Sequence, residues 1–439
     1  MYDTIPNIQT HSRRITMKKT LLLSVVASTM IMAGGDIAPV EPIIVPVVES
    51  GWKFDGNMVA YYQTQDSTTT DLFGTDASRN NFGIQLRAVN DDLFWGLGAG
   101  FEVTGLASSS LISDGNIQTA GTYNNNIGGA LTQAYLTYNI DMIDTGLKLG
   151  RQTLPKALSP FAFSEQWTPV QNTFDAALVV NSSIPDTTLV YAFVDKANGS
   201  FNANIDTFGL ANPTTPAPDS NGIHMITAQN KSFEGLTLTG SFYYAQEMTQ
   251  NVAPNTATDD IMVAWGDAKF TYDGYSIGLQ GGSVITGEPV GYKDTMAYGA
   301  KIGAKFNIFD TDFASCVAFS SVDDGNVPIH NLGTGVKTPL YTQMILNQGV
   351  IKTDTDYVMA KAGADVLGGH FGVAFGYAIE NRTLGLNNSP FELDVSYKTK
   401  VTENTELFAA YVMTDADDAT FNGGDAQNFV RVWARYNFK

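Results

Sequence analysis

The stretch that decides the fold is the last one, Asn428–Phe438, with the sequence NFVRVWARYNF. From Val430 onward every second residue is apolar. The residues between these apolar positions are Arg431, Trp433, Arg435 and Asn437. An alternation with a period of two predicts a β-strand that has one apolar face and one mostly polar face. Aromatic residues gather at the end of the strand, where a membrane–water interface would hold them. The stretch therefore predicts a strand with one face toward lipid and the other toward water.

The same alternation recurs along the chain and predicts eighteen strands, with sixteen as the alternative. The predicted strands cover residues 53–65, 80–90, 93–105, 130–140, 144–152, 173–182, 187–196, 222–231, 235–247, 260–272, 274–285, 295–308, 312–322, 355–366, 369–380, 390–400, 404–414 and 427–438. An even number of strands is typical of bacterial membrane barrels. In the strand 144–152, Arg151 falls on the face that should meet lipid, and the alternation does not explain it.

The connections between the predicted strands alternate in length. Connections after odd-numbered strands are mostly long, for example 106–129, 153–172, 248–259 and 323–354, and those after even-numbered strands are short, for example 91–92, 273 and 367–368. A membrane barrel with both termini in the periplasm has long outer loops and short periplasmic turns, whereas a soluble β-sandwich has no reason to alternate in this way. The sequence therefore predicts an all-β fold, a transmembrane antiparallel β-barrel.

The beginning of the chain predicts export from the cytoplasm. Met17-Lys18-Lys19 is positively charged, an apolar run follows to Met32, and small residues offer a cleavage site. We interpret residues 1–33 as a signal peptide, with Met17 as the expected true start. Residues 34–51 form a proline-rich leader, and residues 52–439 form the barrel. No later segment approaches the roughly 18–20 apolar residues of a transmembrane helix.

The composition narrows the class of partner. The chain has a formal net charge of −19, which argues against nucleic acid, whose phosphates need Lys and Arg, and favours cations. The single cysteine, Cys316, excludes an internal disulfide, and we expect it to be a small buried or lipid-facing residue.

Charged residues at alternate strand positions predict a water-filled lumen. Facing Arg or Lys toward mid-membrane lipid would cost roughly 2–4 kcal/mol each, and a lumen removes that cost. The candidate pore-lining residues on strands are Arg87, Lys148, Lys301, Lys305, Lys361, Asp365, Arg431 and Arg435. The alternative is that these charges only solvate and pair with one another, without selecting a solute.

One predicted outer loop, 153–172, is apolar and aromatic and contains three prolines, unlike a solvated loop. Such a loop should pack against a surface, and the inner wall of the barrel is available. We therefore predict that it folds inward and narrows the pore, with Lys156 and Glu165 as lumenal charges. It could instead cap the barrel mouth or contact a neighbouring subunit.

Signals for chemistry are weak, so an enzyme is not expected. The sequence has no Gly-x-Ser-x-Gly, His-Glu-x-x-His or P-loop motif. We expect no cofactor and no metal site. Ca²⁺ at the acidic runs Asp323-Asp324 and Asp415–Asp418 is a minor alternative, because the second run lacks the glycine of an EF-hand loop.

Several strings resemble a known family, the porins of epsilon-class proteobacteria related to the Campylobacter major outer membrane protein and, more distantly, OprD-type porins. The strings are GRQTLPKALSPF (150–161), FDAA (174–177), QNKSFEGL (229–236) and PLYTQ (339–343). The resemblance implies an eighteen-stranded barrel that passes ions and small hydrophilic solutes, sometimes as a homotrimer. The closing strand also resembles the signal that the barrel-assembly machinery recognises, with Tyr436 and Phe438 as its aromatic residues. Lys439 after them departs from the usual terminal aromatic.

These observations predict a porin in the outer membrane of a Gram-negative bacterium, in contact with lipid, ions and small solutes. Net acidity favours a weak preference for cations. A rival is a solute-specific channel for small organic acids or peptides, in which a ladder of Lys301, Lys305, Lys361, Arg431 and Arg435 guides anionic groups. A surface adhesin or an outer-membrane enzyme is a more distant alternative.

Overall fold

The computed structural model describes residues 51–118, 127–198, 204–206, 209–210, 221–252, 255–287, 293–381, 390–415 and 426–439. The predicted signal peptide and nearly all of the proline-rich leader lie outside these residues.

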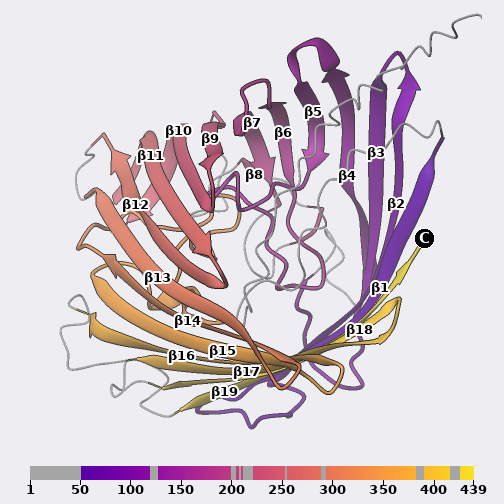
Figure 1. Cartoon of the computed structure of the whole chain (residues 1–439). Helices are drawn as coiled ribbons and strands as arrows, with labels where there is room; N and C mark the ends of the chain where they lie inside the picture. The colour runs from indigo at the N-terminus through magenta and orange to yellow at the C-terminus, as the bar shows by residue number, and fades with distance from the viewer. Residues whose placement is uncertain are drawn as a thin grey trace, which may run out of the picture.

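The chain forms a closed antiparallel β-barrel (Figure 1). The strands are β1 (Lys53–Gln65), β2 (Ser78–Phe94), β3 (Leu97–Ala107), β4 (Ile127–Ile140), β5 (Thr145–Gln152), β6 (Phe174–Asn181), β7 (Thr187–Ala197), β8 (Gly209–Leu210), β9 (Ile223–Phe233), β10 (Leu236–Val252), β11 (Asn255–Tyr272), β12 (Tyr275–Thr286), β13 (Thr295–Ile308), β14 (Thr311–Val322), β15 (Thr355–Val366), β16 (Gly369–Asn381), β17 (Phe391–Thr402), β18 (Thr405–Asp415) and β19 (Gln427–Phe438). The two-residue β8 pairs only with the last two residues of β7, and β7 pairs directly with β9, so the ring itself contains eighteen strands.

The closing strand predicted from the sequence is confirmed. β19 pairs with β1 over ten positions, from Gly56 opposite Phe438 to Gln65 opposite Phe429, and this pairing seals the ring. Gly56 has a steric role here, because a Cβ atom at this position would overlap the Gln85 carbonyl oxygen of β2 and lie 2.8 Å from the ring of Phe438. The final aromatic ring therefore covers the first strand at the seam.

Two predicted connections are wrong. The turn predicted at 91–92 lies at Trp95-Gly96, because β2 continues to Phe94. The long loop predicted at 248–259 is largely strand, because β10 and β11 keep pairing to Val252 and Asn255 after an irregularity between Ala245 and Met248. Backbone hydrogen bonds between two strands do not require an apolar face. A hairpin of mostly polar residues can therefore continue beyond the barrel wall.

The two faces of the wall are exposed in opposite ways. On β19, Arg431 and Trp433 of the inner face are 2% and 1% exposed, whereas Val432 of the outer face is 44% exposed. The outer face of other strands is also apolar and exposed, as at Leu149 and Ile302. The exposed face of these strands is thus apolar and points out of the barrel, whereas the inner face carries charged residues such as Arg431 together with buried apolar residues such as Val263 and Met359. Cys316 is buried on the inner face of β14.

Two connections fill much of the ring's interior (Figure 1), residues 153–173 between β5 and β6 and residues 323–354 between β14 and β15. Their Phe161, Leu332 and Met344 belong to one buried apolar cluster with Tyr243 and Met359 of the wall. The core of this protein therefore lies inside the barrel. Two single-turn 3₁₀ helices occur, η1 (Asp141–Ile143) and η2 (Asn347–Gly349). Within the described ranges, no helix has the length and apolar character needed to cross a membrane.

Candidate functional site in the barrel lumen

Loop 153–173 crosses the lumen and contacts opposite parts of the wall. At one end Phe161, fully buried, packs edge-on against Tyr243 of β10 and Trp265 of β11, at centroid distances of 5.7 and 5.4 Å. The Phe161 N–H donates to the Tyr243 hydroxyl at 3.1 Å. At the other end the Tyr61 hydroxyl of β1 donates to the Trp167 carbonyl at 2.6 Å. A loop with this many apolar side chains folds inward because the inner wall can bury them.

Glu165 connects this loop to loop 323–354. Its carboxylate is 5% exposed and accepts hydrogen bonds from Trp167 Nε1 at 2.6 Å, Asn331 Nδ2 at 2.8 Å and the Lys337 N–H at 3.1 Å. The Thr334 hydroxyl donates to the same carboxylate. A buried carboxylate needs this many donors to offset its loss of water. Glu165, predicted as a lumenal charge, therefore lies at the junction of the two loops.

Lys337 is the buried cation of the same junction. Its Nζ donates to the Met344 and Ile345 carbonyls at 3.1 and 2.7 Å and to Gln348 Oε1 at 3.2 Å, and it lies 4.8 Å from the ring of Trp167. Burial lowers the pKa of Lys337 to about 8, and the negative charge of Glu165 opposes that shift.

The wall holds loop 323–354 with two carboxylates. Glu392 and Asp394, on the inner face of β17, accept backbone N–H groups of Leu346 at 2.8 Å and Ile345 at 3.3 Å. Both carboxylates are buried. Acidic wall residues are thus used to fix the loop in place.

Arg431 and Arg435 line the wall next to loop 153–173, as their strand positions predict. Arg431 is buried, donates to Gln63 Oε1 at 3.2 Å, and lies 5.3 Å from the ring of Trp167. Arg435 donates to the Pro169 carbonyl at 3.4 Å. Both guanidinium groups therefore support the loop.

A second group of cations lies on the wall formed by β11 and β13. Lys301 Nζ is 4.1 Å from the ring centroid of Tyr341, whose hydroxyl donates to Asp267 at 2.5 Å. Lys269 lies 3.4 Å from the same aspartate. Burial is the main cause that raises the pKa of Tyr341, and the charge of Asp267 adds to it. Lys156 of loop 153–173 donates to the Thr338 carbonyl at 3.0 Å.

The other predicted residues lie elsewhere on the wall, although Lys361 interacts electrostatically with Lys301 and Asp394. Arg87 pairs with Asp55 at 2.7 Å, and Lys148 lies 3.7 Å from the ring of Tyr135. Lys361 is half-buried on the inner face of β15. Lys305 and Asp365 are exposed at the end of the barrel that carries the short turns, where Asp365 contacts His370 at 2.6 Å. The structure thus brings Lys156, Glu165, Arg431 and Arg435 to the loops but leaves Lys305 and Asp365 outside.

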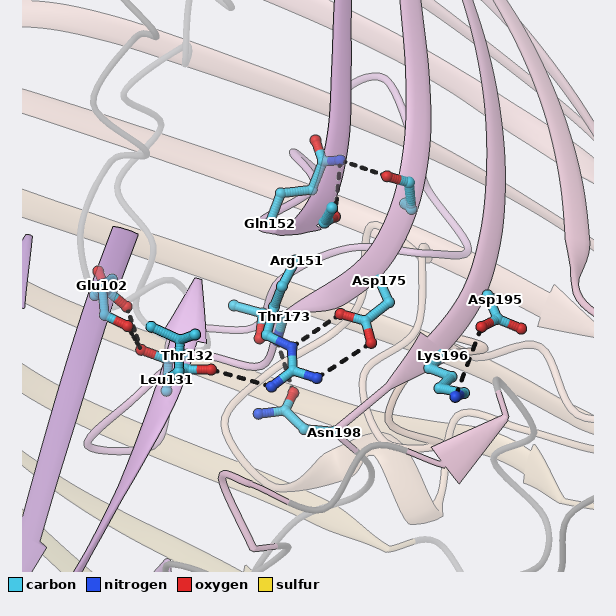
Figure 2. A network of polar contacts seen from close by, with 12 residues as sticks. Glu102, Leu131, Thr132, Arg151, Gln152, Thr173, Asp175, Asp195, Lys196 and Asn198 are labelled. Atoms are coloured by element: carbon cyan, nitrogen blue, oxygen red, sulfur yellow. Dashed lines mark hydrogen bonds and ion pairs between the residues drawn. The ribbon is translucent and has the colours of Figure 1, made fainter. Parts of the chain in front are cut away.

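Arg151 forms an ion pair that the alternation did not predict (Figure 2). Its Nε and Nη2 lie 2.8 and 3.2 Å from the carboxylate of Asp175 on β6, and its Nη1 donates to the Leu131 carbonyl at 3.1 Å. Gly150, with φ +121°, precedes it, and β5 continues to Gln152. An outward arginine is tolerated here because a neighbouring strand supplies its counter-charge.

The sequence prediction missed loop 323–354 as a second inward loop. Its buried members include Asn331, Lys337 and Met344. The signal was available, because this connection is the longest in the chain and combines apolar residues with a central Lys-Thr-Pro, as loop 153–173 combines them with three prolines.

The acidic run at Asp323-Asp324 is occupied by the protein itself: Asp323 accepts the Met296 N–H at 3.0 Å, and Asp324 pairs with Lys293. Residues 416–418 of the other acidic run lie outside the described residues.

Comparisons with known proteins place the fold. No family model matches the chain, and no curated protein matches its sequence. Solved structures do match. OccAB3 of Acinetobacter baumannii has a TM-score of 0.68 at 12% identity, over 88% of this chain and 99% of that one. OccK9 (OpdG) of Pseudomonas aeruginosa has a TM-score of 0.67 at 13% identity, over 88% and 98%. OpdK of Pseudomonas aeruginosa, in a structure with vanillate, has a TM-score of 0.65 at 13% identity, over 88% and 98%. These similarities confirm the eighteen-stranded barrel.

Proposed function

We propose that this protein is a porin in the outer membrane of a Gram-negative bacterium, which lets ions and small hydrophilic solutes diffuse through its lumen. The observation that carries the proposal is the inverted wall: apolar side chains such as Leu149 and Ile302 are exposed outside, and charged ones such as Arg431 and Glu392 lie inside. A protein in water would expose the polar face, whereas a bilayer requires the apolar one. The fold shared with solved Occ-type barrels supports the same function.

Loops 153–173 and 323–354 set the width of this pore in our proposal, because they fill the lumen and are joined at Glu165. We keep a weak preference for cations, since the net charge is strongly negative. The test is single-channel recording of detergent-purified protein in a planar bilayer under a KCl gradient. Stable conductance steps are expected, with a reversal potential of the sign that cation flow produces. Folded protein that leaves the bilayer silent would contradict the porin, and the opposite sign would contradict only the cation preference.

A second candidate is a channel specific for small organic acids. The specific observation is the pair Lys301 and Lys269 beside Tyr341 on the lumenal wall, since ammonium groups near an aromatic ring offer a site for an anionic group. One of the similar structures contains vanillate. Flux of an organic acid into proteoliposomes should then saturate and fall with Lys301→Gln. Lys305→Gln is the matched control, because Lys305 lies on the same strand face but is exposed at the turn end. Linear flux that Lys301→Gln does not change would contradict this candidate.

Assembly partners follow from the same proposal. Tyr436 and Phe438 on the closing strand would direct insertion by the barrel-assembly machinery, and Tyr436 is 45% exposed on the outer face. A homotrimer is a further prediction of the family resemblance, and the mass of the protein–detergent complex in solution tests it.

A further inference from the structure

The short turns of the barrel contain an unusual set of side chains. Four of them are two-residue turns in which both central residues have positive φ: Trp95-Gly96, Asp273-Gly274, Phe309-Asp310 and Leu367-Gly368. This geometry, a type I′ turn, matches the twist of the flanking strands and favours Asn, Asp or Gly at its first central position. Of these first positions, only Asp273 has a favoured residue type.

The other three first positions hold large apolar residues under backbone strain. Trp95, Phe309 and Leu367 have φ of 54°, 51° and 53°, a region that costs roughly 1–2 kcal/mol for a residue with a Cβ atom. Their side chains are 91%, 97% and 94% exposed, so packing within the protein does not repay that cost. The fold could be built with Asn or Asp at these positions, as it is at Asp273. A large apolar side chain that is both strained and exposed indicates a contact outside the protein.

The arrangement of these residues selects the kind of contact. The turn with Trp95 joins β2 to β3 and lies across the closed ring from the turns with Phe309 and Leu367, which join the neighbouring pairs β13–β14 and β15–β16. Met142, 93% exposed on η1 between β4 and β5, lies next to the turn with Trp95 at the same end. A compact protein partner would touch only one of these two sides. A flat layer perpendicular to the barrel axis would touch both.

The apolar outer face also continues into these turns. Phe94, which precedes Trp95, is 56% exposed and packs edge-on against it at 5.7 Å. Above Phe309, the outward rings of Phe306 and Phe313 stack at 5.7 Å. Aromatic side chains of membrane proteins concentrate at the boundary between lipid headgroups and acyl chains. The turn tips thus extend the surface that meets lipid.

We propose that Trp95, Phe309 and Leu367 insert into the headgroup layer of the inner leaflet and hold the turn end of the barrel at a fixed depth. This inference rests on the proposed location in a membrane. Asp92 and Asp310 lie beside two of the tips, so an anionic lipid surface is a poorer partner than a zwitterionic one. The lipid to use as a probe is therefore phosphatidylcholine.

Tryptophan fluorescence measures the insertion of Trp95 directly. The protein is folded into phosphatidylcholine vesicles whose acyl chains carry bromine either near the headgroup or near the chain end. Trp167, Trp265 and Trp433 are buried inside the barrel, so Trp52, 42% exposed, is the other tryptophan that the bromines can reach. The difference between wild type and Trp95→Asn isolates Trp95. We expect that difference to be quenched most by bromine near the headgroup and to be shielded from aqueous iodide. Full iodide access without bromine quenching would overturn the proposal.

Stability in vesicles gives a second test, whose sign separates lipid contact from strain. Asn suits a positive φ, so the triple variant Trp95→Asn/Phe309→Asn/Leu367→Asn should be more stable than wild type if the tips touch only water. If the tips insert in lipid, the variant should unfold more easily, with an unfolding equilibrium constant raised about tenfold in urea titrations. Asp273→Asn is the matched control and should change little. A triple variant that is stabilised or unchanged would overturn the proposal.

Conductance of the same vesicles keeps this inference separate from the pore. Channels with normal conductance but tips open to iodide would refute only the insertion of the tips. Quenched tips in silent vesicles would refute only the porin. Tips that are exposed in pure phosphatidylcholine but protected in isolated cell envelopes would point to a protein partner and would overturn the lipid contact.

Discussion

Phe161 and Phe309 both lie in connections between strands, yet one is completely buried and the other is 97% exposed. Phe161 belongs to a long loop that can reach the inner wall, where Tyr243 and Trp265 cover it. Phe309 belongs to a two-residue turn that is too short to reach another part of the protein. The difference shows that an apolar residue in a connection predicts a covering surface, and that the length of the connection decides whether the protein or its surroundings supply that surface.

The largest effect on stability is expected when the Phe161 and Phe309 side chains are truncated and the two variants are compared. Phe161→Ala should lower the free energy of unfolding by about 3–5 kcal/mol, because it removes a buried ring and leaves a cavity. Phe309→Ala should change it by less than about 1 kcal/mol in detergent, since the lost contact is outside the protein and the strain remains. Urea unfolding of the two variants in the same detergent checks the prediction. Similar losses for the two variants would contradict the contrast between covered and uncovered connections.

The next largest effect on stability is expected at Glu165, where the two loops meet. Glu165→Gln keeps the shape of the side chain but replaces one acceptor oxygen by a donor that faces other donors, Trp167, Asn331 and the Lys337 N–H. We expect a loss of about 1–3 kcal/mol in unfolding free energy, together with larger and noisier single-channel conductance as the loops loosen. The control is Glu234→Gln in an exposed turn. A stable variant with unchanged conductance would show that the loops do not depend on this junction.

The strands were predictable, and the way the loops meet was not. β1, β13, β15 and β19 have the bounds that the alternation predicts, because each strand must present one apolar face to its surroundings. The apolar composition of loop 153–173 likewise allowed its inward fold to be predicted from local sequence. The partners of Glu165 could not be predicted in this way, because Asn331 and Lys337 lie more than 160 positions away in sequence and meet Glu165 only after the barrel closes.

Lys337 should make stability depend on pH. Its pKa is about 8 in the folded protein and 10.5 in the reference state, so the unfolded chain binds the proton more tightly between these values. The free energy of unfolding should therefore rise as pH increases from about 8 to 10.5. Below pH 8 the folded protein carries the buried Lys337 charge, and its stability is at its lowest with respect to this group. The measurement is the difference in unfolding free energy between wild type and Lys337→Met across this range. A difference that is flat or falls with pH would contradict burial as the dominant influence on this lysine.

The smallest effect should come from the end of loop 153–173 that meets β19. Arg435 donates to the Pro169 carbonyl at 3.4 Å, a long hydrogen bond, while its guanidinium lies 5.4 Å from the ring of Trp433. Arg435→Lys keeps the charge but loses the planar group, so we expect a loss of about 0.5–1.5 kcal/mol and little change in ion selectivity. Arg435→Gln removes the charge as well and should shift the reversal potential further toward cations. If Arg435→Lys changed selectivity as much as Arg435→Gln, the guanidinium geometry and not its charge would control passage. Loop 153–173 would then act on ions through this contact, whereas a substitution of Phe309, on an exposed turn, would leave the reversal potential unchanged.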